Sequence, residues 1–332
     1  MKSNFKHMRC IVLQKRGRTF DDSHARDARL VPGWHDGDHD HRQFRVGRSQ
    51  RRSAQQSVAA LGDNPHLCSV TEAAAQMLLI LLFGILLTYA AMTTNFPYRD
   101  AQLYAIDQAL GLDRRAYLYF VNNRPLLAEL AGYAYMSLLP QFALVPMVLM
   151  IANQLPNLRR WMLAFGLALI MTSALSVFAP AVAAFVYLDL TPQVYANISS
   201  TVYTHVPTLE ALRAGTFRSI PLDNLEGLIT FPSFHTAGAI MFIWALRKVP
   251  YVRWPAIALN AALIAATPID GAHYFIDLVG GAVVAFAAIA MSYWICRVCA
   301  CRRDHDGTRP RSRTGSGTRF GLMDLVPYCV YG

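Results

Sequence analysis

Apolar stretches of membrane length constrain this chain more than any other feature of its sequence. A helix needs about 20 predominantly apolar residues to cross the hydrocarbon core of a bilayer. Six stretches reach or approach that length: 73–93, 130–152, 161–187, 233–249, 254–270 and 274–297. Over the whole chain, 54% of the residues are hydrophobic and 16% are charged, whereas soluble domains carry about a quarter of charged residues. The sequence therefore predicts an all-α fold, a polytopic membrane helical bundle with about six transmembrane helices.

The positive charge of the chain lies mainly at its two ends. Residues 1–65 and 302–319 are polar and arginine-rich, and the whole chain has a formal net charge of +10. We expect disordered basic tails over 1–70 and 301–332, on either side of a membrane-embedded domain over 71–300. A basic tail could bind nucleic acid or anionic headgroups, but these tails lack zinc spacing and aromatic interleaving. We therefore expect cytoplasmic tails with no nucleic-acid partner.

The cysteines and histidines outside the apolar stretches do not predict a cofactor site. Three of the six cysteines, Cys296, Cys299 and Cys301, cluster at the end of the last stretch. Such a cluster could hold a metal or carry palmitate, but we interpret it as cytoplasmic thiols. The run HDGDHDH at 35–41 resembles a metal ligand set, yet it lies in a low-complexity tail. No metal and no cofactor are expected.

Basic residues predict which connections face the cytoplasm. Every second short connection carries them, and they are Arg159, Arg160, Arg247, Lys248 and Arg253. If the N-terminal tail is inside, the positive-inside rule places 94–129, 188–232 and 271–273 on the opposite face. His235 and His273 begin the fourth and sixth stretches. We therefore expect both at one face of a cytoplasmic (inner) membrane, the periplasmic or outer side.

Three further patterns describe the segments around these histidines. Residues 97–129 include DAQLYAIDQALGLDRRAYLYF, whose apolar spacing predicts an amphipathic helix on the membrane surface or capping the bundle. Residues 188–231 form a long mixed loop, a kind of segment that is often functional. Small residues at 237–239 and the Gly280–Gly281 pair predict close helix packing. Pro140 and Pro180 fall inside predicted spans.

The stretch HYFID carries a pair of residues with chemical potential. His273 and Asp277 are four apart, so on a helix they lie on one face within hydrogen-bonding reach. A carboxylate beside an imidazole fixes the ring tautomer and prepares the other nitrogen as a nucleophile or base. An interfacial histidine with a structural partner is the alternative. An acid one turn inside an apolar span is costly, however, and usually marks function.

The stretch FPSFH, residues 231–235, carries the complementary groups. Pro232 suits the first turn of a helix, and Ser233 and Thr236 offer hydroxyls. The free N–H groups of a first turn bind anions, and His235 would be placed to protonate a departing oxygen. A simple capped helix start explains Ser233 but not His235.

These two motifs resemble the type 2 phosphatidic acid phosphatase superfamily, which shares a Pro-Ser-x-His segment and a later His-x-x-x-Asp segment. The sequence HYFIDLVGG at 273–281 is most similar to the branch of the inositol phosphorylceramide synthases, the aureobasidin-resistance type inositolphosphotransferases. The resemblance covers roughly 125–297. It implies that His273 attacks phosphorus to form a phosphohistidine, that Asp277 orients His273, and that His235 is the general acid. It also implies that Ser233 helps to bind the phosphoryl oxygens.

Two departures from the family pattern concern cations. The family has an arginine six residues before the nucleophile, where this chain has Thr267. Its early Lys-x-x-x-x-x-x-Arg-Pro segment is also incomplete, because Tyr117 stands where lysine would precede Arg124. A phosphate dianion still needs cationic donors. We expect Arg213, Arg218 and Arg124 to be phosphate-binding residues. Asp270 either tunes His273 or caps its helix.

The leading hypothesis is an integral membrane enzyme, a lipid phosphatase (phosphoric ester hydrolase) or an inositolphosphotransferase-like transferase. Its expected partners are a lipid phosphate substrate and the bilayer; lipid identity, hydrolysis or transfer, and oligomeric state stay open. One alternative is a catalytically inactive lipid-binding member, because of Thr267. Another is a membrane transporter, whose polar residues would lie deep in several spans. Here the ionisable residues gather at one interface, which favours surface chemistry.

Overall fold

The structure, a computed structural model, describes residues 65–191, 193–198, 205–217 and 227–305. Within these ranges every regular element is a helix and none is a strand. The predicted all-α fold is therefore confirmed. The tails up to residue 64 and from 306, the HDGDHDH run and Arg218 lie outside the described residues.

The chain divides into two compact units, which we describe separately. The first unit contains residues up to Ala75, and its described part is the beginning of α2 (Pro65–Met92). The second unit starts at Gln76 and contains all other described residues. Every functional residue considered below belongs to the second unit.

Each predicted apolar stretch contains helix, but not every helix has the length and composition of a span. Within the described ranges, three do: Thr71–Met92, α7 (Leu155–Phe178) and Phe275–Cys299 of α12 (Phe275–His305). A fourth would be the pair α5 (Pro125–Met136) and α6 (Leu138–Ile151), bent by 52°. The predicted fourth stretch forms α10 (Phe234–Leu246), which has only 13 residues, and the fifth forms α11 (Arg253–Asp270).

Two sequence-based predictions of helix extent are wrong. The stretch 161–187 is not one helix, because α7 ends at Phe178 and Pro180 follows it; Ala184–Tyr187 forms a separate short helix, α8. The amphipathic segment is two helices, α3 (Asp100–Ala109) and α4 (Arg114–Asn122). Gly111, with φ +71°, lies between them, and a positive φ interrupts a right-handed helix.

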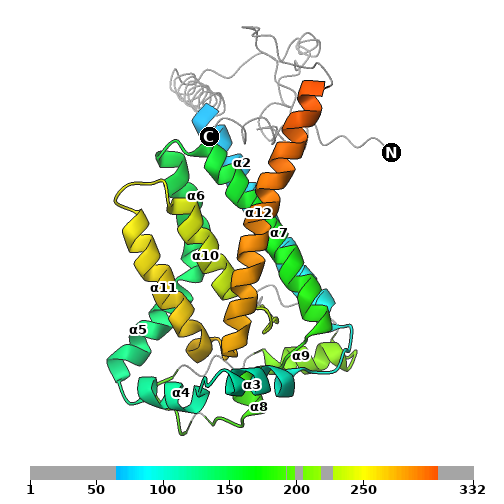
Figure 1. The fold of residues 1–332 in the computed structure, drawn as a ribbon, viewed down its shortest axis with the longest axis vertical. Coiled ribbons are helices and arrows are strands. Elements are labelled where there is room, and N and C mark those ends of the chain that lie inside the picture. The colour runs from blue at the N-terminus through cyan, green and yellow to red at the C-terminus, as the bar shows by residue number, and fades with distance from the viewer. Residues whose placement is uncertain (1–64, 192, 199–204, 218–226, 306–332) are drawn as a thin grey trace, which may run out of the picture. The chain divides into compact units, whose positions relative to one another are not determined.

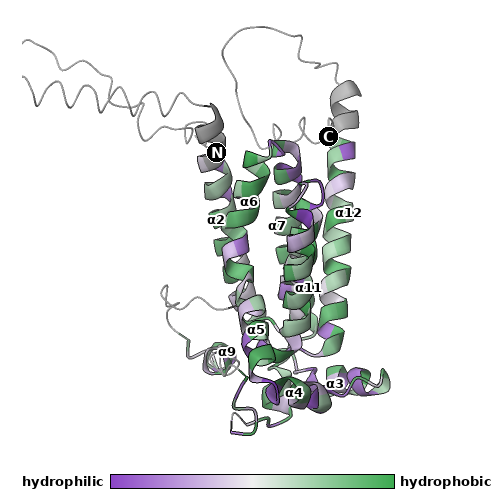
Figure 2. Ribbon diagram, turned by 90° about the vertical axis from the view of Figure 1, so that its left-hand side faces the viewer, coloured by the Kyte–Doolittle hydropathy of each residue, from purple (hydrophilic) through white to green (hydrophobic). Residues whose placement is uncertain are grey.

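The shorter helices of the second unit gather at one end of the bundle (Figure 1). There α3, α4, α8 and α9 (Val206–Arg213) lie beside the first turns of α10 and α12. The connections from α6 to α7 and from α10 to α11 lie at the opposite end. Arg247 and Lys248 belong to the second connection, and Arg159 and Arg160 follow the first one, near the start of α7. The long helices are mainly hydrophobic along their length, whereas α3, α4 and α9 are mixed (Figure 2). The predicted face with both histidine motifs is therefore the end covered by amphipathic helices.

Aromatic packing anchors the start of α10 to the bundle. Phe234, the first residue of α10, makes an edge contact with Phe165 of α7 at 5.3 Å between ring centroids. Phe165 is fully buried and also contacts Phe142 and Trp161. Such pairs stabilise a fold beyond their burial. They hold the FPSFH motif against α7.

The Gly280–Gly281 pair lies where α12 crosses the start of α10. A Cβ atom at Gly281 would overlap the backbone carbonyl of Ser233 and lie 3.0 Å from Thr236 Cβ. At Gly280 it would lie 3.0 Å from side-chain atoms of Phe231 and Pro232. The prediction that these glycines form a packing seam is confirmed, and the seam joins the two motifs.

Candidate active site

His273 lies in the short turn between α11 and α12. It is 3% exposed. The preceding Ala272 has φ +51°, a left-handed conformation that is costly for alanine and persists where the surroundings enforce it. The N–H of Ala184 donates to the Ala272 carbonyl at 3.0 Å. The backbone that carries the imidazole is thus held from α8.

Asp277 pairs with His273 as the four-residue spacing predicted. His273 Nδ1 lies 3.3 Å from Asp277 Oδ2, and the N–H of Tyr274 donates to the same oxygen at 2.8 Å. Asp277 is fully buried, and its other oxygen, Oδ1, has no hydrogen-bond partner. Because Nδ1 faces the carboxylate, the remaining ring nitrogen, Nε2, is the one available for chemistry.

The FPSFH motif meets HYFID directly. Ser233 is the N-cap of α10, and its hydroxyl accepts from the N–H of Thr236 at 3.3 Å. The backbone N–H of Ser233 donates to the carbonyl of Asp277 at 3.0 Å. The hydroxyl of Thr236 is buried and has no hydrogen-bond partner, so it can donate to a bound group. Two segments more than forty residues apart are thereby joined at one point.

His235 faces His273 across this junction. Their ring centroids are 6.0 Å apart, with an angle of 60° between the ring planes. Tyr135 of α5 stacks on His235 at 4.2 Å, and its hydroxyl lies 3.5 Å from His235 Nδ1. A catalytic contact spans about 3 Å, so a single tetrahedral group between the rings could contact both.

The surroundings of His273 favour its neutral form. Burial lowers the pKa of His273 to about 3; a hydrogen bond to the backbone of Thr230 opposes the shift, while the charges of Arg114 and His205 add to it. A neutral imidazole keeps a lone pair, which a nucleophile requires. At neutral pH the His273 ring is therefore uncharged.

Two buried carboxylates of α3, which sequence reasoning missed, support the start of α12. Asp107 accepts the backbone N–H groups of Phe275 and Ile276, each at 2.9 Å. Asp100 accepts the Tyr274 hydroxyl at 2.9 Å. The two acids are seven residues apart and share one helix face with Leu103. That spacing is a signal the sequence contains, but their partners lie about 170 residues away.

Arg114 is the second feature that sequence reasoning missed. It is 1% exposed, and its Nη1 donates to the carbonyl of Pro268 at 2.8 Å. Its Nε and Nη2 have no hydrogen-bond partner in the part of the chain that the structure describes. Burial lowers the pKa of Arg114 to about 10, opposed by the charges of Asp277 and Asp107. The side chain is therefore a cation at neutral pH, close to the His273–Asp277 pair.

The segment 180–184 connects all the parts of the site through its main chain. Asp100 accepts the N–H groups of Val182 and Ala183. The Ala181 carbonyl accepts the Thr230 hydroxyl at 3.1 Å, and the Val182 carbonyl lies 3.3 Å from His205 Nε2. With the bond from Ala184 to the residue before His273, this segment links α3, the residues that precede the two motifs, Thr230 and Ala272, and the residue before α9.

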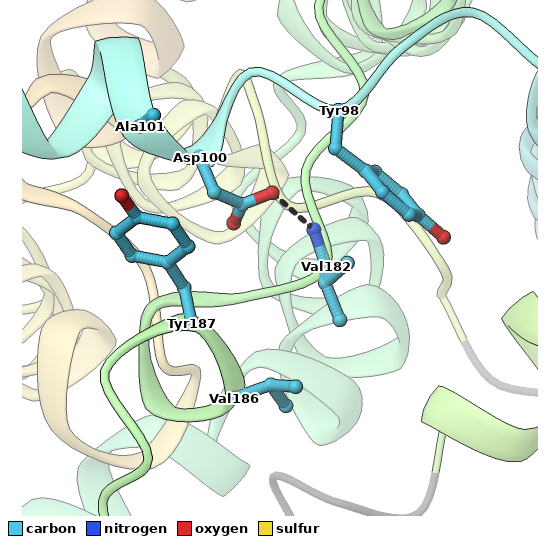
Figure 3. A pocket seen from close by; sticks show the side chains of 6 residues that line it. All are labelled: Tyr98, Asp100, Ala101, Val182, Val186 and Tyr187. Atoms are coloured by element: carbon cyan, nitrogen blue, oxygen red, sulfur yellow. Dashed lines mark hydrogen bonds between the residues drawn. The ribbon is translucent and has the colours of Figure 1, made fainter.

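A pocket of about 210 Å³ opens beside Asp100 (Figure 3). Its lining residues are Tyr98, Asp100, Ala101, Val182, Val186 and Tyr187. The tyrosine rings and aliphatic side chains make most of its surface, and the Asp100 carboxylate points to the Val182 backbone. Asp100 lines the pocket and also accepts the hydroxyl of Tyr274, the residue that follows His273. The pocket is therefore connected to the His273 backbone through Asp100 and Tyr274.

The arginines predicted to bind phosphate have other partners where they are described. Arg213 Nη2 donates to the Phe96 carbonyl at 2.6 Å, and its guanidinium lies 4.0 Å from the Tyr98 ring. Arg124 Nη1 donates to the Phe120 carbonyl at 2.7 Å. Arg218 lies outside the described residues. Thr267, at the position of the missing arginine, is buried and bonds to its own helix at Leu263.

Asp270 does not pair with His273 in the structure. It is the last residue of α11, is 5% exposed, and its Oδ2 has no hydrogen-bond partner. A Cβ at Gly132 of α5 would lie 3.7 Å from its Oδ1. Within the described residues, no three His, Cys, Asp or Glu side chains are grouped so that they could hold a metal.

Comparison with known proteins gives one finding that covers the site. A family model described as the PAP2 superfamily matches residues 101–291, more than half of the chain, including both histidine motifs and the α3–α4 segment. Neither the curated proteins nor the solved structures gave a match.

Proposed function

The chain belongs to the PAP2 superfamily of phosphatases and phosphotransferases, and from this premise we propose that it forms a phosphohistidine on His273 while acting on a lipid phosphate ester in the membrane. The observation that carries the proposal is the 6.0 Å separation of the His235 and His273 rings, each held by its own motif. Asp277 on Nδ1 of His273 supplies the orientation that such a nucleophile needs.

The proposed reaction has two steps. In the first, the anionic ester binds together with a proton on His235, Nε2 of His273 attacks phosphorus, the bond from phosphorus to the ester oxygen breaks, and His235 gives its proton to that oxygen. In the second, water or an alcohol attacks the phosphohistidine, His235 takes the proton of the attacking oxygen, and the P–N bond breaks. Water yields a phosphatase and an alcohol yields a transferase. The His235–His273 pair serves both outcomes.

The phosphoryl oxygens need donors around the two rings. The Ser233 and Thr236 hydroxyls and the first N–H groups of α10 are proposed to supply part of this contact, since helix N-termini favour anions. Arg213, Arg218 and Arg124 remain our proposed cationic ligands. Arg213 and Arg124 would exchange their backbone-carbonyl contacts for phosphate, and charge-assisted bonds to phosphate are the stronger kind.

The resemblance of HYFIDLVGG to the inositol phosphorylceramide synthase branch favours transfer of a phospho-headgroup between lipid alcohols. We propose that the site faces the periplasmic or outer side, because the basic connections lie at the other end of the bundle. Supplying the purified protein with lipid phosphate, with and without an alcohol acceptor, separates the two reactions. A transferase forms new lipid and releases little phosphate, and a phosphatase does the reverse.

The proposed function is tested by trapping the intermediate. Purified protein incubated with ³²P-labelled lipid phosphate should acquire acid-labile label, and His273→Ala should lose both the label and turnover while keeping its thermal midpoint within a few degrees. His235→Ala should slow turnover, because protonation contributes about 10²- to 10⁴-fold. Turnover retained by His273→Ala would refute the mechanism. An inactive lipid-binding protein or a transporter would show no label in the wild type.

A further inference from the structure

The α3–α4 segment contains charged side chains that the proposed reaction does not use. Asp107 and Arg114 are both 1% exposed, although they belong to helices that the sequence assigns to the membrane surface. We propose that Arg114 and Asp107 are positioning residues, which fix the charge and the position of the His273–Asp277 pair without touching the substrate. This proposal rests on the proposed phosphohistidine reaction.

Arg114 lies beside Tyr274 and Phe275, the residues between His273 and Asp277 in the chain. Asp277 is the largest favourable charge acting on Arg114, ahead of Asp107. Three rings surround the guanidinium, those of Phe185, Tyr274 and Phe275, with centroids 5.6–6.0 Å away. Two guanidinium nitrogens, Nε and Nη2, and the Oδ1 of Asp277 have no hydrogen-bond partner among the described residues, so opposite charges are buried in one region.

A buried carboxylate without a compensating charge is very costly and takes up a proton instead. The charge of Arg114 opposes the uptake of a proton by Asp277 and thereby favours the form that accepts Nδ1–H of His273. The Nδ1–H tautomer leaves the lone pair on Nε2, where the attack on phosphorus occurs. Arg114 therefore acts on the reaction through Asp277.

The same geometry argues against Arg114 as a phosphate ligand. Phosphate must approach Nε2 of His273, whereas Asp277 occupies the Nδ1 side. Arg114 is drawn to Asp277, bonds to the Pro268 carbonyl and packs among the rings next to the α12 start. The positioning role predicts a change in turnover with little change in substrate affinity.

Asp107 fixes the position of the first turn of α12. Its two carboxylate oxygens each accept one N–H of the first turn of α12, those of Phe275 and Ile276. These N–H groups have no partner inside the helix, and a carboxylate there also meets the positive end of the helix dipole. His273 and Asp277 lie on either side of this turn, so its orientation sets their separation. Asp107 is also the second negative charge acting on Arg114.

The kinetic test measures kcat and KM of variants that change the charge of Arg114, keep it, or change the charge of its exposed neighbour. Arg114→Met removes the charge while keeping an apolar side chain of similar length, and replacement of buried ionic groups in this way is often tolerated by the fold. We expect kcat to fall about 100-fold with KM within about twofold, because a misplaced reacting group costs about that much. Arg114→Lys restores the charge, and its kcat should be at least tenfold higher than that of Arg114→Met. Arg115→Met is the matched control, since Arg115 is exposed and bonds to the Leu188 carbonyl, and it should match the wild type.

Asp107 is tested by a pair of variants. Asp107→Asn keeps one acceptor for the first turn of α12, and Asp107→Ala removes both. We expect the alanine variant to lose more kcat than the asparagine variant, with KM little changed in either. Equal kcat for wild type and Asp107→Ala would overturn the role of this residue.

A second readout does not depend on turnover. In protein labelled with ¹⁵N-histidine, the His273 signals, assigned by their loss in His273→Asn, should report a neutral ring with the proton on Nδ1. Arg114→Met should shift this tautomer balance, and Arg115→Met should not. An unchanged tautomer with unchanged kcat in Arg114→Met overturns the proposal. A large rise in KM together with loss of vanadate binding overturns it too, because that result would mean that Arg114 binds phosphate directly. If the wild type shows no phosphohistidine, the proposed function fails, while the tautomer still decides the role of Arg114.

Discussion

Replacing Gly281 by alanine should separate the two histidine motifs. At this position α12 crosses the N-cap turn of α10 so closely that a Cβ would overlap the Ser233 carbonyl and lie 3.0 Å from Thr236 Cβ. Carbon atoms in contact prefer about 3.5–4.0 Å, so the helices must part by roughly 0.5–1 Å. Backbone atoms form the obstacle, so a side-chain rotation cannot relieve the clash.

The expected cost follows from this displacement. Overpacking of a core position destabilises a fold by about 1–3 kcal/mol, and a reacting group misplaced by about 1 Å can lose about 100-fold in rate. The displacement acts on the bond between the Ser233 N–H and the Asp277 carbonyl, which joins the halves of the site. We therefore expect kcat for phosphate release or transfer to fall about 100-fold, together with a lower thermal midpoint in detergent.

Gly166 provides the matched control. It lies inside α7, and no atom lies within 4 Å of a Cβ placed there. Gly166→Ala should be neutral or slightly stabilising, because alanine favours a helix by about 1 kcal/mol over glycine. Gly280→Ala, which meets side chains and no backbone atoms, should lie between the two. If Gly281→Ala keeps wild-type kcat and thermal midpoint, the reasoning from the α10–α12 crossing is refuted.

Three further predictions concern residues around this crossing. Because burial lowers the pKa of His273 to about 3, the unfolded chain binds a proton below about pH 6.5 that the folded protein does not bind. The free energy of unfolding should therefore fall with decreasing pH, by up to about 1.4 kcal/mol per pH unit. Thermal midpoints that fall with the same pH slope in wild type and His273→Asn would contradict this. Tyr135→Leu, which removes the ring stacked on His235, should lower kcat about tenfold while Tyr135→Phe keeps most of it; steady-state kinetics in which the phenylalanine variant is the slower would exclude a stacking role. Phe165→Ala should lower the free energy of unfolding by about 3–5 kcal/mol, and denaturation in detergent showing a loss below about 1 kcal/mol would mean that this core relaxes.

The pairing and capping of residues at the candidate site could be predicted from the sequence because their signals are local. His273 and Asp277 are one helical turn apart, and the structure pairs them. Ser233 follows a proline and precedes an apolar run, and it caps α10. The role of these residues in catalysis is still a proposal.

The supporting shell could not be predicted, because its partners are distant in the chain. Asp107 reaches Phe275 across a separation of 168 residues, and nothing near Asp107 indicates that helix. For Arg114 a local signal does exist, since Leu118 and Val121 follow at four and seven residues and all three are buried. Arg114 thus lies on the apolar face of α4, while its neighbour Arg115 is exposed. A basic residue in such a register is usually assigned to the surface, and tertiary packing decides otherwise.

The end of α7 was predicted wrongly for a related reason. Hydrophobicity continues from α7 through Pro180 to α8, so apolar composition alone extends the span. The backbone leaves the helix after Phe178 because the Pro180 carbonyl accepts the Arg99 N–H at 2.8 Å and Asp100 takes the next free amides. These contacts come from Arg99, the N-cap of α3, and from Asp100, its first residue.

The tether formed by residues 180–184 has a consequence for how substrate preference can diverge. Its contacts to Asp100 and to the residues before the two motifs use its own main-chain amides and carbonyls, which are the same whatever side chains the tether bears. Val182 of the tether and Val186 of α8 line the pocket beside Asp100, and the side chain of Val182 can therefore vary in size without loss of these bonds. If the proposed lipid substrate enters this pocket, a library restricted to these two valines should change which lipids are used while the His273–Asp277 pair stays in place.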